Sequence, residues 1–95
     1  MGFNQTYLTI NRAWESDFES QVPERERGYV LSRMKKLQTA FQNELYQEAI
    51  ATTKILFGYF SRIASNQDNP LRVHASKMAN RFWNLEAILS KQKIK

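Results

Sequence analysis

The start of the chain carries apolar residues at intervals of four, three, four and four. They are Phe3, Tyr7, Ile10, Trp14 and Phe18. These intervals place the five side chains on one face of a helix. Threonines between them are common in strands, but the aromatic spacing continues past them without changing to a period of two. The pattern therefore predicts a helix over residues 3–21.

A second helix is predicted over residues 23–42. Apolar residues repeat at intervals of four, three and four at Val30, Met34, Leu37 and Phe41, and Tyr29 and Leu31 widen this stripe. Proline is tolerated at the first helical position because the amide hydrogen that it lacks would be unpaired there. We therefore expect Pro23 to end the first segment and begin the second. Glu24 and Glu26 fall in the first turn, where the helix dipole favours anions.

A polar stretch, residues 42–44, separates this segment from the next. Because asparagine can adopt the left-handed conformation that often ends a helix, we expect Asn43 to help the chain reverse between Phe41 and Tyr46. The alternative is one continuous helix over residues 23–65. At about 1.5 Å per residue it would be about 60 Å long and would need a coiled-coil partner.

The third predicted helix, over residues 45–65, has the broadest apolar face. One seam consists of Tyr46, Ala49, Thr53, Leu56, Phe60 and Ile63, and an adjoining seam of Ile50, Phe57 and Ala64. A face this broad is typical of the most buried helix of a domain. Gly58 costs the helix about 1 kcal/mol relative to alanine, and we expect it to allow close approach by a neighbouring helix.

The fourth predicted helix covers residues 70–91. It begins after Asn69 and Pro70, a capping side chain followed by a proline in the first turn. Its apolar seam alternates intervals of four and three at Leu71, Ala75, Met78, Phe82, Leu85 and Leu89. Lysines follow at the negative end of the helix dipole, and the tail 92–95 is expected to fray.

The junction of the second and third segments resembles the turn of a tetratricopeptide helical hairpin. Ala40 and Phe41 correspond to the end of the first helix, and the run 46–50, Tyr-Gln-Glu-Ala-Ile, to the opening of the second. The chain lacks the turn glycine of that family and has no second copy at the 34-residue period of such arrays. The resemblance implies a helical hairpin at this junction and no binding residues.

Composition agrees with one all-α domain over residues 1–95. The chain has only three glycines and two prolines, and its apolar share of 42% is enough for one core but not for two. Short connections favour antiparallel neighbours. We therefore expect a compact up-and-down four-helix bundle or two stacked helical hairpins.

The chain contains no cysteine, which excludes a disulfide framework, a thiolate metal site and a thiol nucleophile. The N-terminal residues lack the continuous apolar core of a signal peptide, and no stretch is apolar for long enough to cross a membrane. We expect a soluble, cytoplasmic protein without a membrane partner.

Residues that could carry catalysis are sparse. His74 is the single histidine, and we interpret it as a packing or helix-surface residue beside Lys77 and Arg81. The three glycines are isolated, so no glycine-rich phosphate loop is present. Among the clustered carboxylates only Glu15 and Glu19 share a helix face. We expect no enzyme activity, catalytic residue, metal, cofactor or small-molecule substrate.

Charge is distributed unevenly around the net value of +5, with an acidic start and a basic remainder. Like charges four residues apart would repel on a helix. Such pairs are Glu15–Glu19, Glu44–Glu48 and Lys77–Arg81. The acidic stripe of the first helix could pair with the basic stripe of the fourth, within one chain or between two, or both stripes could be solvated.

Trp83 is the leading candidate for a protein interface. Small residues flank it on its own helix face, at Ser76, Ala79 and Ala87. Such a tryptophan is either a binding anchor or a lid on the edge of the bundle. With the cations Lys77 and Arg81 beside it, the leading hypothesis is a non-enzymatic adaptor or regulator. Its partner would be an acidic protein surface or a second copy of the chain.

The alternative hypothesis is a nucleic-acid-associated accessory protein. Arg33, Lys35 and Lys36 form the densest basic cluster, and Arg81 stands on the fourth helix, where it could reach base edges. Such binding would weaken steeply with added salt. A third hypothesis, a small subunit of a larger assembly, predicts oligomerisation or poor solubility of the isolated chain.

Overall fold

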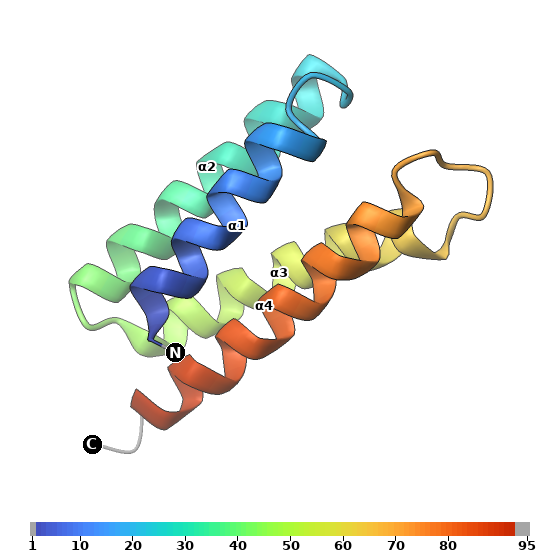
Figure 1. Cartoon of the computed structure of the whole chain (residues 1–95). Coiled ribbons are helices and arrows are strands. Elements are labelled where there is room, and N and C mark those ends of the chain that lie inside the picture. The colour runs from blue at the N-terminus through green and yellow to red at the C-terminus, as the bar shows by residue number, and fades with distance from the viewer. Residues whose placement is uncertain (1, 93–95) are drawn as a thin grey trace.

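The computed structural model describes residues 2–92, which form four helices and no strand (Figure 1). The helices are α1 (Phe3–Asp17), α2 (Glu24–Gln42), α3 (Tyr46–Ser65) and α4 (Arg72–Gln92). The predicted all-α fold is confirmed, including helix rather than strand at the threonines of α1. Of the tail expected to fray, Gln92 belongs to α4, and residues 93–95 lie outside the described residues.

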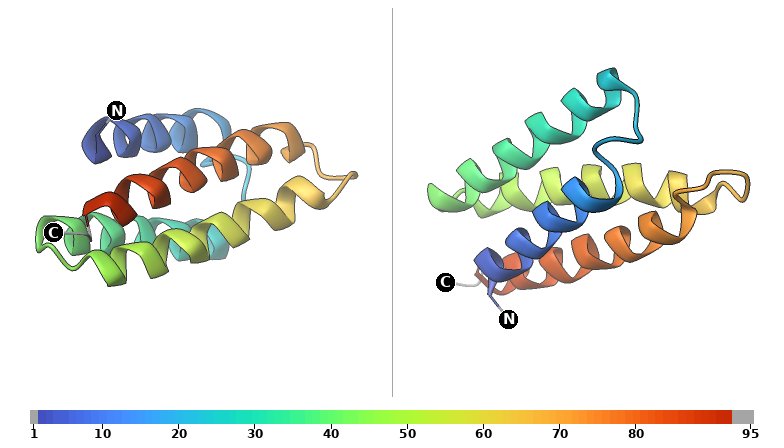
Figure 2. Two further views of the ribbon diagram at one scale, coloured as in Figure 1. Left: turned by 90° about the horizontal axis from the view of Figure 1, so that it is seen from below. Right: turned by 45° about the horizontal axis from the view of Figure 1, so that its top comes forward.

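Successive helices run antiparallel, so α1 begins and α4 ends at the same end of the molecule (Figures 1 and 2). Helix α3 packs against α2 and α4, and α1 packs against α4. Among the described residues, no Cα atom of α1 lies within 8 Å of a Cα atom of α2. The fold is a four-helix bundle made of two stacked hairpins, α1 with α2 and α3 with α4. The two helices of the first hairpin are held apart.

Large side chains fill the space between α1 and α2. The rings of Phe3 and Phe41 stack with their centroids 3.8 Å apart. The Tyr7 hydroxyl donates a hydrogen bond of 2.9 Å to the carbonyl oxygen of Met34. Aromatic rings thus replace close backbone contact on this side of the bundle.

The predicted apolar seams form the core. Every seam residue of the first and fourth segments is buried. On α2 the prediction is wrong for Leu31, which is 42% exposed because it lies on the outer side of the helix. On α3 the buried set also includes Thr52 and Tyr59, which lie outside the predicted seams.

Helix α1 ends at Asp17, earlier than the predicted residue 21. The amides of Gln21 and Val22 both donate to the carbonyl oxygen of Phe18, at 2.8 and 3.0 Å, and form a turn in place of continued helix. Proline disfavours helical geometry in the residue before it, so the chain has to leave the helix ahead of Pro23. Phe18 and Val22 nevertheless stay buried.

The other helix starts differ from prediction by one or two residues. Pro23 precedes the first helical residue of α2, with ψ of 148°, and Leu45 likewise precedes α3. Helix α4 begins at Arg72, but Asn69 caps it as predicted, because its Oδ1 accepts a 2.8 Å hydrogen bond from the Leu71 amide.

The chain reverses between α2 and α3, as predicted, so the alternative of one continuous helix is wrong. The left-handed residue is Glu44, with φ of 59°, and not Asn43, with φ of −93°. The Leu45 amide donates to the Ala40 carbonyl oxygen at 2.8 Å, and the Glu44 amide to that of Phe41 at 3.0 Å. These two bonds form a Schellman motif, which needs the left-handed conformation one residue after the cap.

Gly58 does not have the predicted role. A Cβ atom added there would meet no atom within 4 Å beyond its own helical surroundings. The alanines Ala75 and Ala79 of α4 are buried instead and form part of the face that α4 packs into the core.

Candidate protein-binding groove

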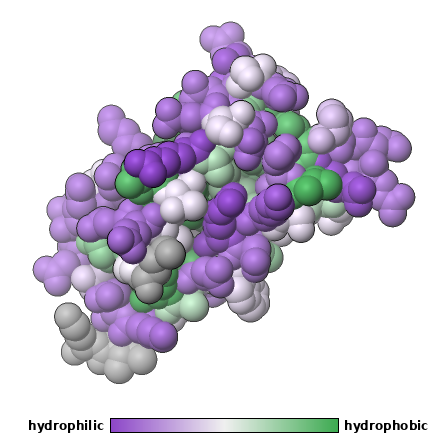
Figure 3. Space-filling model, in the orientation of Figure 1, coloured by the Kyte–Doolittle hydropathy of each residue, from purple (hydrophilic) through white to green (hydrophobic). Residues whose placement is uncertain are grey.

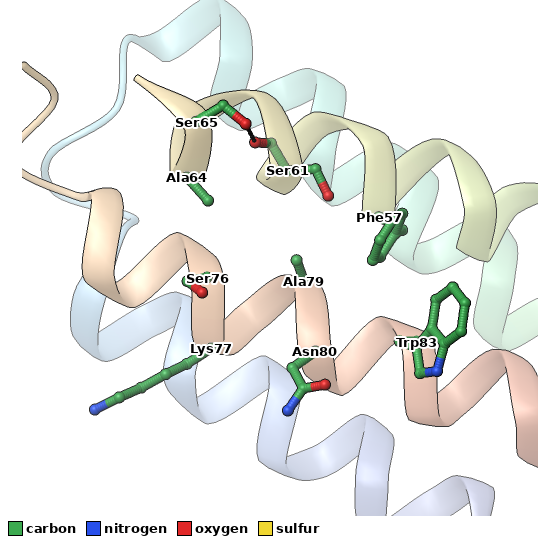
Figure 4. Close-up of a pocket in the computed structure, with 9 residues that line it drawn as sticks. All are labelled: Phe57, Ser61, Ala64, Ser65, Ser76, Lys77, Ala79, Asn80 and Trp83. Atoms are coloured by element: carbon green, nitrogen blue, oxygen red, sulfur yellow. Dashed lines mark hydrogen bonds between the residues drawn. The ribbon is translucent and has the colours of Figure 1, made fainter. Parts of the chain in front are cut away.

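An open groove of about 560 Å³ runs between α3 and α4 (Figure 4). We call it the Trp83 groove. Helix α3 contributes Phe57, Ser61, Ala64 and Ser65, and α4 contributes Ser76, Lys77, Ala79, Asn80 and Trp83. The groove exists because the facing side chains between its two aromatic residues and its far end are small.

Trp83 is the most exposed large apolar side chain among the described residues, at 60%. Its ring lies beside that of Phe57, with centroids 5.7 Å apart and planes tilted by 48°. Figure 4 shows both rings at one end of the groove, with Ala64 and Ser76 towards the other end. Trp83 therefore packs against the neighbouring helix and still offers most of its surface to a partner.

Small neighbours account for the prominence of Trp83, as the sequence suggested. Ser76 and Ala79 line the groove with it, whereas Ala87 is exposed and does not. Phe57 is the largest of the groove residues that sequence reasoning missed, which also include Asn80 and the other residues that α3 contributes. Its apolar position was visible, but its pairing with Trp83 depends on the register between α3 and α4, which no local pattern records.

The predicted cations beside Trp83 separate in the structure. Lys77 lines the groove, and its side chain extends away from the two aromatic rings (Figure 4). Arg81 lies elsewhere, half-buried beside Thr6 and Thr9 between α1 and α4. Residues two apart on a helix point about 200° apart, so Arg81 and Trp83 occupy opposite sides of α4. The expected surface of Trp83, Lys77 and Arg81 is corrected to Trp83 and Lys77.

In two of the three predicted like-charge pairs, the two residues do not lie on one helix. Glu19 follows the end of α1 and Glu44 lies in the turn before α3, so of the three pairs only Lys77 and Arg81 share a helix. Helices α1 and α4 do pack together, but no ion pair between Glu15 and either cation forms in residues 2–92.

His74 connects α4 to the end of α1. Its Nδ1 lies 3.5 Å from Oδ2 of Asp17, and its ring meets the edge of Phe18 at a centroid distance of 6.5 Å. His74 therefore faces the carboxylate of Asp17, a neighbour from α1 that the sequence did not place beside it. Both side chains are partly exposed, so the pair contributes little stability.

The four cations of the nucleic-acid hypothesis do not form one surface. The Arg33 guanidinium stacks 3.6 Å above the Tyr29 ring centre and donates to the Tyr29 carbonyl oxygen at 3.3 Å. Lys35 and Lys36 line a separate hollow between α2 and α3. Arg81 lies on α4, which makes no backbone contact with α2 among the described residues.

A second hollow that sequence reasoning missed lies between α2 and α3. We call it the tyrosine hollow, and it is lined by Arg25, Glu26, Tyr29, Tyr59 and Arg62. Arg25 and Tyr29 are four residues apart, a spacing that predicts a shared helix face. Only the packing of α3 against α2 adds Tyr59 and Arg62.

The face seen in Figure 3 is mainly hydrophilic, and its apolar residues form separate patches. None of the helices within residues 2–92 combines the length and apolar character needed to cross a membrane. The same residues contain no group of three or more potential metal ligands.

No known protein family, curated protein sequence or solved structure matches the chain.

Proposed function

We propose that this protein is a small non-enzymatic adaptor or regulator that binds a segment of another protein in the Trp83 groove. The observation that supports the proposal most strongly is an indole that is 60% exposed beside a groove of about 560 Å³. Covering apolar surface gains about 25 cal/mol per Å². Tryptophan is also enriched among the residues that dominate binding energy in protein interfaces.

The chemistry of the groove favours an acidic amphipathic helix as the partner segment. Two antiparallel helices form a trough in which a third helix can place its apolar side, as helix-in-groove complexes do. Lys77 is the charged residue among the groove's lining residues, and no carboxylate lines it. The net charge of +5 would also steer an acidic partner towards the protein.

The lack of cysteine supports a cytoplasmic setting for this protein.

Affinity capture from native lysate with matched variants tests the proposal. Trp83→Ala removes the exposed indole, and Leu31→Ala removes another exposed apolar side chain from the outer side of α2. We expect wild type and Leu31→Ala to retain one shared partner that Trp83→Ala loses, while circular dichroism shows all three folded. Retention of every partner and of the oligomeric state by Trp83→Ala would contradict the proposal.

Charge-reversal variants of this protein, measured for binding to the purified partner, test whether the partner is acidic. Lys77→Glu should weaken binding about tenfold, the equivalent of about 1.4 kcal/mol, since it places a carboxylate against an acidic segment. Arg81→Glu makes the same charge change at a residue that lines the hollow between α1 and α4 and not the groove, and should alter affinity less than about twofold. Equal effects of the two variants would mean that only the overall charge of the protein matters.

Nucleic-acid binding remains the alternative proposal, supported by the basic residues of α2. Micromolar binding to duplex DNA or single-stranded RNA should then weaken steeply with salt and fall again in an Arg33→Glu, Lys36→Glu double variant. The Trp83→Ala variant distinguishes the two functions, because it should leave nucleic-acid binding unchanged.

A further inference from the structure

The tyrosine hollow is a second cavity, of about 370 Å³, and shares no lining residue with the Trp83 groove. Its walls are the first turn of α2, with Arg25 and Glu26, and the C-terminal part of α3, with Arg62. Side chains from two helices therefore face one space, and their positions relative to one another depend on packing between α2 and α3.

Two tyrosines form the floor of the hollow and are held in place. Their ring centroids lie 5.9 Å apart, and Tyr59 is only 8% exposed. The Tyr59 hydroxyl donates a 2.8 Å hydrogen bond to Oε1 of Glu26. The Arg33 guanidinium covers the face of Tyr29 at 3.6 Å. The hollow thus has two tyrosine rings whose positions are fixed by these contacts.

The charges around the hollow are unbalanced. Arg25 and Arg62 line it, against the single carboxylate of Glu26. Within residues 2–92, neither arginine has a carboxylate oxygen within 4.0 Å. Burial and the Glu26 carboxylate raise the pKa of the Tyr59 hydroxyl, so Tyr59 adds no negative charge near neutral pH. An anion would reduce the repulsion among these guanidinium groups.

We propose that the tyrosine hollow binds the dianionic phosphate group of a small phosphate monoester. Guanidinium groups donate paired hydrogen bonds that fit phosphate oxygens, and the hollow is lined by one arginine from each of two helices. The Tyr59–Glu26 hydrogen bond turns one oxygen of the nearby carboxylate towards the tyrosine, which limits its competition for the arginines. The volume of the hollow falls within the range of small-ligand sites.

Isothermal titration calorimetry at low ionic strength tests this site with inorganic phosphate, ribose 5-phosphate and adenosine monophosphate, at about pH 8, where the phosphate is dianionic. We expect saturable binding of the two monoesters. Equal affinities would show that the phosphate alone is recognised, and tighter binding of the nucleotide would show that its base contacts the tyrosines. Either result supports the site.

Arg25→Gln and Arg62→Gln should each weaken binding about tenfold or more, because each removes charge-assisted hydrogen bonds. Arg72→Gln is the matched control, since it removes the same charge from an exposed position on α4, and its affinity should stay within about twofold of wild type. The proposal is overturned if neither monoester saturates. It is equally overturned if all three variants weaken binding alike, since only net charge would then attract the anion.

Discussion

The two helical hairpins of this bundle hold together in different ways. Helices α3 and α4 form the most extensive contact of the fold, and small buried residues such as Ala75 lie on the packed face of α4. Helices α1 and α2 have no comparably close backbone contact and are bridged by stacked rings of Phe3 and Phe41 and by the Tyr7 hydroxyl. Small buried residues accompany the stacked rings of Phe60 and Phe82 in the close contact of α3 with α4, whereas large side chains bridge the wider gap between α1 and α2.

The difference has consequences for binding. Large rings fill the space between α1 and α2, so the aromatic surface there is buried in the core. Small residues along α3 and α4 leave the Trp83 groove open at their edge. There only part of the Trp83 surface contacts Phe57. The pair of helices with the closest packing is therefore also the one that offers a binding surface.

The largest expected effect is the loss of the ring that joins both hairpins. Phe60 is fully buried and lies 5.6 Å from Phe82 of α4 and 5.1 Å from Phe18, measured between ring centroids. Phe60→Ala should lower the free energy of unfolding by about 3–5 kcal/mol, measured by urea denaturation. The control Leu31→Ala should change it by less than about 0.5 kcal/mol. Similar midpoints for the two variants would mean that Phe60 is not at the centre of the core.

A smaller effect is expected at the bridge between α1 and α2. Tyr7→Phe keeps the ring but removes the hydrogen bond to the Met34 carbonyl oxygen, and should cost about 1 kcal/mol. Tyr46→Phe is the matched control because Tyr46 is half-buried and its hydroxyl makes no hydrogen bond to the described residues. Equal stabilities of the two variants in thermal denaturation would show that the rings alone bridge the pair.

The turn between the hairpins should be open to improvement. Glu44 holds a left-handed conformation that costs a residue with a Cβ atom about 1 kcal/mol or more. Glu44→Gly should therefore raise the free energy of unfolding by about 1 kcal/mol. Asn43→Gly should not, because Asn43 has a negative φ. The reverse ranking in denaturant would place the left-handed residue at position 43.

The smallest expected effect is that of Gly58→Ala, which belongs to a comparison between two kinds of small residue on α3 and α4. Gly58→Ala should stabilise the protein by about 0.5–1 kcal/mol, since helix propensity improves and nothing obstructs the new methyl group. Ala75→Leu, at a fully buried position, should instead destabilise it by about 1–3 kcal/mol. Destabilisation by Gly58→Ala would restore the close helix approach predicted from the sequence.

Local patterns were sufficient for the helices and their buried faces. Intervals of three and four identify a buried seam because they return a side chain to the same face, and every residue predicted for the seam of α4 is buried, although buried Ala79 was not among them. The end of α1 was missed because an apolar residue such as Phe18 can stay buried in a turn after the helix has stopped. Likewise, the motif that ends α2 placed Glu44 in the left-handed conformation despite the preference of asparagine for it.

The candidate site was predictable only in part. Trp83 stood out because small residues flank it on its own helix, but Phe57 comes from another helix and its contact depends on packing. Arg81 was misplaced because its proximity in sequence was taken for proximity on the surface. The tyrosine hollow combines α2 with α3, so no single helix contains enough of it to be recognised.

Photocrosslinking at the Trp83 groove tests the proposed function most directly. Trp83→p-benzoylphenylalanine keeps an aromatic side chain in the groove, and the same substitution at Leu31 provides a control on α2, away from the groove. Irradiation in native lysate should link the first variant to one protein through an acidic, helical segment identified by mass spectrometry, and should not link the second to it. Absence of an adduct at position 83, or the same adducts at both positions, would contradict the assignment of the groove as a protein-binding site.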